Sequence, residues 1–128
     1  MSEELVSVRY MVDDVEAAID FYSSHLGFAV LSDAAPAFAD VTRGNLRLLL
    51  SGPTSSAGRP MPDGRQPEPG GWNRLQIEVS DLDGKVESLQ AMGTILRSGI
   101  VTGSGGRQVV LDDPAGNPVE LFEAADGI

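Results

Sequence analysis

The sequence VRYMVDDVEAAIDFY at Val8–Tyr22 carries the pattern that decides the fold, and it has a counterpart, LQIEVSDLDGKVESL, at Leu75–Leu89. In each stretch, apolar residues first alternate with polar residues, which is the period of a β-strand with one buried face. An aspartate follows, and apolar residues then recur every three or four positions, as they do in an amphipathic helix. Both stretches therefore predict a strand that leads directly into a helix.

The helix boundaries are marked by residues that cap helices. Asp14 and Asp81 precede the two helical patterns, and an aspartate side chain can accept a hydrogen bond from the first free N–H groups of a helix. Gly27 and Gly93 follow the patterns, and glycine readily adopts the left-handed conformation that ends a helix. Further strands are predicted at residues 28–32, 37–42 and 46–50 in the first half and at 95–101, 107–111 and 118–123 in the second.

The two halves therefore have the same order of elements, β-α-β-β-β, and represent an internal duplication. Gly44-Asn45 in the first half also matches Gly116-Asn117 in the second. Since one helix can cover only one face of each sheet, the other face needs a second purpose. We expect an α+β fold of two tandem βαβββ modules, at residues 5–50 and 72–123, whose curled mixed sheets surround a shared cavity.

The segment 51–71 between the modules contains five prolines and five glycines and almost no aliphatic residues. It is either a passive tether or a lid or arm, because a loop of this length is uncommon in a compact domain. We expect it to cross the outside of the cavity or a partner subunit, with Met61 and Trp72 as apolar anchors.

The composition excludes several classes of function. The 128 residues include no cysteine, which rules out disulfides, thiolate metal sites and a cysteine nucleophile. Nineteen acidic residues against nine basic ones, with Lys85 the single lysine, argue against a nucleic-acid partner. No window of 18 apolar residues predicts a membrane span, and the acidic start Met1–Glu4 is unlike a secretory signal. A cytoplasmic protein is the expectation.

The pattern resembles the vicinal oxygen chelate superfamily, also called the glyoxalase, bleomycin-resistance and dioxygenase family. The resemblance rests on Val12-x-Asp14-Val15-Glu16 with Phe21-Tyr22 and Leu26-Gly27-Phe28, on Val79-x-Asp81-Leu82, and on the ending Asp113-Pro114-x-Gly116-Asn117-Pro118-Val119-Glu120-Leu121. It implies paired βαβββ modules and usually a homodimer with two cavities.

Enzymes of this family hold a divalent metal with side chains from four strand positions, typically histidine and glutamate. The resemblance places these positions at Ser7, Leu48, Arg74 and Glu120. Only Glu120 is an ordinary ligand, so we expect no metal and no other cofactor. We expect Arg74 instead to supply the missing positive charge and to hydrogen-bond the Glu120 carboxylate.

Other residues allow alternative interpretations. The single histidine, His25, is expected to be solvated or to cap the end of the first helix. Glu78 and Glu120 are either a carboxylate pair for acid–base chemistry or the partners of Arg9 and Arg74 in a polar wall. The glycine-rich stretch 103–106 lacks the lysine of a phosphate-binding loop and is expected to be a flexible loop.

We therefore expect non-catalytic binding or sequestration of a drug-sized small molecule in an apolar cavity, similar to the metal-free antibiotic-resistance branch of the family. The alternatives are a lyase, isomerase or dioxygenase with an atypical metal site or a glutamate base, and an accessory domain with a filled cavity. The expected ligand-binding residues are Ser7, Arg9, Met11, Phe38, Leu48, Leu50, Trp72, Arg74, Gln76, Glu78, Glu120 and Phe122.

Overall fold

The computed structural model describes residues 4–125, and the chain divides into two compact units between Pro69 and Gly70. We call these units the first and the second module. Met1, Ser2 and Glu3, which belong to the acidic start noted in the sequence, lie outside the described residues. Each module consists of a mixed sheet and a helix, which confirms the α+β class and the repeated order of elements.

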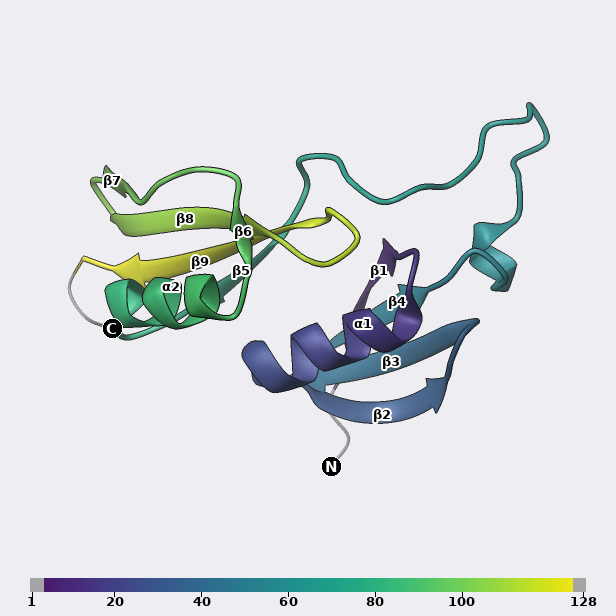
Figure 1. Ribbon diagram of the computed structural model, residues 1–128, viewed down its shortest axis with the longest axis horizontal. Coiled ribbons are helices and arrows are strands. Elements are labelled where there is room, and N and C mark those ends of the chain that lie inside the picture. Colours follow the sequence, from purple (N-terminus) through teal and green to yellow (C-terminus); the bar gives the residue numbers. More distant parts are fainter. Residues whose placement is uncertain (1–3, 126–128) are drawn as a thin grey trace. The chain divides into compact units, whose positions relative to one another are not determined.

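The first module contains a sheet with strand order β1-β4-β3-β2, in which β1 runs parallel to β4 (Figure 1). Its helix α1 continues into a turn of π-helix, η1, and a short 3-10 helix, η2, lies in the connecting segment. The elements are β1 (Val6–Met11), α1 (Val15–Asp20), η1 (Phe21–His25), β2 (Ala29–Ala34), β3 (Phe38–Arg43), β4 (Leu46–Ser51) and η2 (Ser56–Gly58).

The second module repeats this arrangement, with strand order β5-β9-β8-β6 and with β7 also paired to β8. Its first strand again runs parallel to its last. The elements are β5 (Leu75–Glu78), α2 (Leu82–Ala91), β6 (Ile95–Leu96), β7 (Val101–Gly103), β8 (Gly106–Asp112) and β9 (Pro118–Ala124).

The single strand predicted at residues 95–101 is wrong, because it is divided into β6 and β7. The backbone N–H groups of Arg97 and Ser98 both point to the carbonyl of Val110, at 2.7 and 3.4 Å. Two successive residues therefore face one partner residue, which interrupts the regular ladder in the way a β-bulge does.

The predicted helix caps are confirmed. Asp14 accepts a hydrogen bond from the backbone N–H of Ala17 at 3.1 Å, and Asp81 accepts one from Gly84 at 3.0 Å. Gly27 and Gly93 have φ angles of +75° and +88°, the left-handed region in which side chains other than glycine are strained. The sequence alone thus predicts where both helices begin and end.

Each module has its own core between its helix and one face of its sheet. In the first module, α1 lies across β3 and β4 (Figure 1), and the edges and faces of Tyr10, Phe21, Tyr22 and Phe28 meet at near-perpendicular angles. In the second module, α2 packs beside β9 and buries aliphatic side chains between helix and sheet. These are Ile77, Leu82, Val86, Leu89, Val109, Leu111, Val119 and Leu121.

The register of β4 corrects one expectation from the sequence. Val8 lies opposite Leu48 and Tyr10 opposite Leu50, and both leucines are completely buried on the face that α1 covers. They do not face an open surface, as the sequence led us to expect for ligand-binding residues. The opposite face of β4 carries Arg47, Leu49 and Ser51.

The difference comes from the lengths of two turns. Arg43 pairs directly with Leu46, whereas Asp112 pairs with Pro118. Counting the same number of residues forward from the two Gly-Asn pairs therefore gives positions in β4 and β9 that differ by one residue in strand register. In a strand, a shift of one residue transfers every side chain to the other face of the sheet.

No helix within residues 4–125 has the length and apolar character needed to cross a lipid bilayer.

Candidate functional site

The candidate site is the face of the second sheet that α2 does not cover, which we call the open face of the second module. Strand pairing aligns Gln76, Glu120 and Val110 in one row on this face, and Glu78, Phe122 and Gln108 in the next. Each row contains one charged side chain and one apolar side chain. The open face therefore combines groups that can orient a ligand with a surface that can exclude water.

Glu120 is the most constrained of these side chains. One of its oxygens, Oε1, accepts a hydrogen bond from Nε of Arg74 at 2.9 Å, and Nη2 of Arg74 lies 2.9 Å from the same oxygen. The other, Oε2, accepts a hydrogen bond from Nε2 of Gln76 at 2.7 Å. The expected contact between Arg74 and Glu120 is therefore confirmed, and Gln76 completes it.

The burial of the pair decides what it can do. The Glu120 side chain is 9% exposed and that of Arg74 is 27% exposed, so the carboxylate lies under its partners and the guanidinium reaches solvent. A carboxylate removed from water needs compensation of this kind. Because a guanidinium has five N–H groups, Arg74 keeps protons that can bind a carbonyl or hydroxyl oxygen of a ligand.

These residues do not fit the divalent metal that the family's enzymes use. Both oxygens of Glu120 already accept hydrogen bonds, and the adjacent group is a permanent cation. Across residues 4–125, no group of three or more histidine, cysteine, aspartate or glutamate residues is arranged to hold a metal ion. We therefore derive no chemistry from a metal at this position.

The face of the first sheet that α1 does not cover, which we call the open face of the first module, also carries polar side chains. Arg9 donates a hydrogen bond through Nη1 to Oγ of Ser51 at 2.8 Å. Asp40, which is buried, accepts a 2.5 Å hydrogen bond from Ser32 and lies 3.6 Å from Nε of Arg47. The expected residues Ser7, Arg9, Met11 and Phe38 lie on this face by strand register.

The predicted anchors of the connecting segment, Met61 and Trp72, are both exposed, at 45% and 69%. Over the ring of Trp72 lies the guanidinium of Arg97, whose Cζ is 4.6 Å from the ring centroid. Sequence reasoning missed Arg97, because it follows a short edge strand and no motif marks it. A weak signal was present, since Arg97 is the one charged residue in the strand predicted at residues 95–101.

A second arginine cluster lies at the start of α2. Arg107 contacts Asp83 at 2.8 Å and Glu123 at 2.6 Å, and Glu123 also accepts a hydrogen bond from the backbone N–H of Leu82. The hydrogen bonds from Arg107 lower the pKa of Asp83 and the pKa of Glu123 below their ordinary values. This cluster fastens the helix to the sheet and does not belong to the open face.

The structure also locates His25 and the glycine-rich stretch 103–106, which the sequence analysis singled out. His25 is half-buried at the end of η1, with its ring edge-on to Phe21 and the centroids 5.5 Å apart. Gly103 pairs with Gly106, so Ser104 and Gly105 form the tight turn between β7 and β8. The glycine-rich stretch is therefore a hairpin turn.

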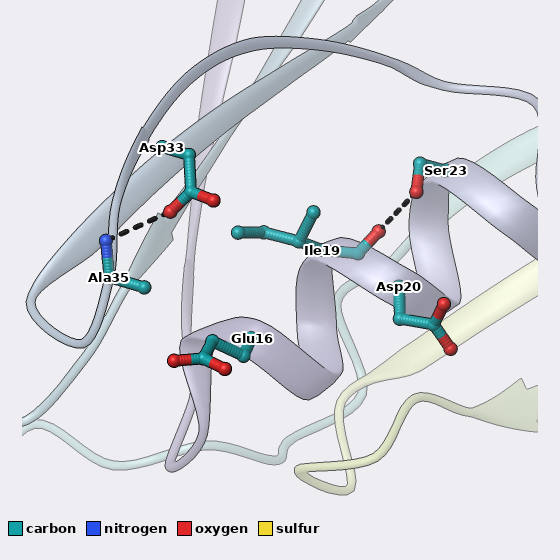
Figure 2. Close-up of a pocket in the computed structure, with 6 residues that line it drawn as sticks. All are labelled: Glu16, Ile19, Asp20, Ser23, Asp33 and Ala35. Carbon is teal, nitrogen blue, oxygen red and sulfur yellow. Dashed lines mark hydrogen bonds between the residues drawn. The ribbon is translucent and has the colours of Figure 1, made fainter.

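A separate hollow of about 560 Å³ lies in the first module beside α1. Figure 2 shows Glu16, Ile19, Asp20 and Ser23 on the helical side, with Asp33 and Ala35 across from them. The three carboxylates are exposed, and Asp33 accepts a hydrogen bond from the backbone N–H of Ala35 at 3.0 Å. No residue predicted from the sequence to bind a ligand lines this hollow.

Comparisons with known proteins point to one family. The family model described as "Glyoxalase/Bleomycin resistance protein/Dioxygenase superfamily" matches residues 4–121. A search of curated proteins gives no significant match.

Solved structures resemble the chain over nearly its whole length. A member of the same superfamily from Sphaerobacter thermophilus DSM 20745 has 28% identity and a TM-score of 0.75, covering 96% of this chain and 98% of its own. TnmS3, an antibiotic binding protein from Streptomyces sp. CB03234, has 25% identity and a TM-score of 0.71, covering 97% and 98%. Lactoylglutathione lyase from Agrobacterium tumefaciens has 22% identity and a TM-score of 0.71, covering 95% and 94%, and shares the fold.

Proposed function

The chain belongs to the Glyoxalase/Bleomycin resistance protein/Dioxygenase superfamily, and from this premise we propose that it binds and sequesters a drug-sized small molecule without chemical conversion. The observation that carries the proposal is the state of Glu120, whose two oxygens are held by Arg74 and Gln76. A carboxylate held in this way has a fixed orientation and a compensated charge. It can position a ligand, whereas a metal ligand must offer its lone pairs to the ion.

The surroundings of the pair support binding by burial. Val110 and Phe122 lie on the same open face of the second module, in the same and the adjacent row as Glu120. Apolar side chains supply affinity, and a few oriented polar groups supply specificity. The resemblance to an antibiotic binding protein at 25% identity is consistent with a role in resistance.

The proposal includes two further properties. The ligand-binding residues on the open face of the second module are Arg74, Gln76, Glu78, Glu120 and Phe122, and Ser7, Arg9, Met11 and Phe38 on the first module contribute a second surface. The protein acts as a homodimer in the cytoplasm. A dimer is supported by β2, an outer strand whose six residues are all exposed and whose outer backbone edge is open to pairing.

The test is a thermal-shift screen of drug-sized compounds with and without EDTA. A ligand that binds only the folded protein raises its stability by about 2.7 kcal/mol when present at 100 times its Kd. We expect a stabilisation that EDTA leaves unchanged and that Glu120→Gln and Arg74→Met reduce. We also expect the bound compound to be recovered in full and chemically unaltered. Arg107→Met is the matched control, because it removes a cation of the same module away from the open face.

Two results would contradict the proposal. The first is stabilisation that disappears with EDTA and returns with one equivalent of a divalent metal. The second is steady conversion of the bound compound, which would support the alternative of an enzyme that uses Glu78 or Glu120 as a base.

A further inference from the structure

Residues 70–72, with which the second module begins, are held against the rest of that module by several hydrogen bonds. The backbone N–H of Gly70 donates to Oδ1 of Asn117 at 2.8 Å, and the carbonyl of Gly71 accepts a hydrogen bond from Nη1 of Arg97 at 2.6 Å. Gly70 and Gly71 have φ angles of +113° and +96°, which favour glycine. The backbone that leads into Trp72 is therefore in a defined conformation.

The side chain of Trp72 is fixed as well, although it is exposed. Arg97 stacks over its ring and is itself held by Oδ1 of Asp112 at 2.8 Å and by the carbonyl of Gly116 at 2.9 Å. With the Gly71 carbonyl, this gives the guanidinium three hydrogen-bond acceptors. The orientation of Arg97 is therefore determined, and the stacking transfers this order to the indole.

An exposed indole held in one orientation has no evident role in the isolated chain. Ordering a side chain costs conformational entropy, which the cation–π contact with Arg97 offsets, but the exposed apolar surface of the ring stays in water. The same arrangement favours binding, since a ligand that stacks on a pre-ordered ring does not have to order it. Large and rigid aromatic side chains have this role in many binding sites.

We propose that Trp72 is a stacking platform for a neutral, planar aromatic ring of the ligand, and that Arg97 is its positioning residue. The proposal rests on the proposed function and specifies the class of ligand. Arg97 already places a cation on one side of the indole, which disfavours a second cation on the other. Asp112 balances the charge of Arg97, so an anion gains no net attraction.

The polar edge of the ligand follows from Arg74. Its Nη1 donates to the carbonyl of Trp72 at 3.2 Å, while its Nε donates to Glu120 at 2.9 Å. One guanidinium thus links the stacking platform to the buried carboxylate. A ring that stacks on Trp72 and carries a carbonyl or hydroxyl oxygen at its edge can reach the remaining protons of Arg74.

The test uses the fact that Trp72 is the single tryptophan of the chain. The indole N–H gives one resolved signal in a ¹H–¹⁵N spectrum, and this signal reports on the ring directly. The probes are coumarin, which is neutral, planar and carries a carbonyl, δ-valerolactone, which has the lactone without the aromatic ring, and N-methylquinolinium, which is planar and cationic. We expect a saturable shift of the indole signal with coumarin and none with the other two.

Variants separate stacking from structural effects. Trp72→Leu should weaken coumarin binding about tenfold or more, as measured by calorimetry. Arg97→Met should shift the indole signal before any ligand is added and should weaken binding several-fold, and Arg97→Lys should restore part of both. Arg65→Met is the matched control, because Arg65 pairs with Asp63 in the connecting segment and lies in the other module.

The inference is overturned if coumarin gives no saturable shift, or if it binds Trp72→Leu as tightly as the wild type. If the Arg97→Met variant loses the circular dichroism signal of the folded protein, the Arg97→Lys variant is used for the test instead. A compound from the thermal-shift screen that stabilises the protein and leaves the indole signal unmoved would overturn this inference while the proposed function stands.

Discussion

Arg74 and Glu120, 46 residues apart in sequence, form a charge pair on the open face of the second module in which the acid is buried and the base is partly exposed. Removing the cation alone leaves a buried carboxylate without its partner. We expect Arg74→Met to lower the free energy of unfolding by about 1–3 kcal/mol, measured by urea denaturation.

The double variant Arg74→Met/Glu120→Gln should recover much of that loss, because it removes the uncompensated charge. Additive losses in this double-mutant cycle would show that the two side chains are independent, contrary to the contact described here.

The Arg107 cluster predicts a dependence of stability on pH. Arg107 lowers the pKa of Asp83 and of Glu123 in the folded state, so their stabilising effect is present above the pKa of the unfolded chain, near 4. It is lost as the pH falls through the lower, folded values, where the unfolded chain binds more protons. We expect wild-type stability to fall more steeply than that of Arg107→Met between pH 5 and pH 3.

Urea denaturation at several pH values checks this, and comparison with the variant removes the contribution of the other acidic residues. Parallel curves for the two proteins would mean that Arg107 does not perturb its partners.

The register of β4 predicts different effects for two residues that the sequence placed together. Leu48 is completely buried beneath α1, so Leu48→Ala should cost about 2–5 kcal/mol of unfolding free energy. Met11 is half-buried on the open face, and Met11→Ala should cost about 1 kcal/mol or less while changing ligand affinity. Equal destabilisation by both substitutions would contradict the register.

We expect sedimentation velocity at micromolar concentration to show a species of twice the chain mass of 13.5 kDa. The exposed edge of β2 is the physical reason, because unpaired backbone groups on a strand are commonly covered by another element or chain. A single species at the monomer mass would reject the dimer.

Short-range patterns made much of the fold predictable. Asp14 and Asp81 cap their helices as expected, because a cap depends on three or four neighbouring residues. The alternation around Gln76 also placed Arg74 on the polar face of its strand, whereas the resemblance to the family implied that Arg74 and Glu120 share one site. Caps and alternation are local relationships, and the sequence expresses them directly.

The features that the sequence did not reveal depend on long-range geometry. The face of Leu48 follows from the pairing of Arg43 with Leu46 in a turn shorter than its counterpart, and residue counting could not detect this. Arg97 reaches the carbonyls of Gly71 and Gly116, neither of which its own neighbourhood specifies. Contacts made through backbone carbonyls leave no mark on residue identity.

Within residues 4–125, every strand pairs only with strands of its own module, and this has a consequence for protein engineering. In the segment of chain that connects the two sheets, the exposed turn at Asp63-Gly64 is held by local hydrogen bonds among Met61, Asp63, Gly64 and Arg65 and by the surface ion pair of Asp63 with Arg65. New chain termini at this turn would cut no β-ladder. The turn is therefore a suitable position for circular permutation, for insertion of a reporter domain, or for dividing the gene into two co-expressed halves.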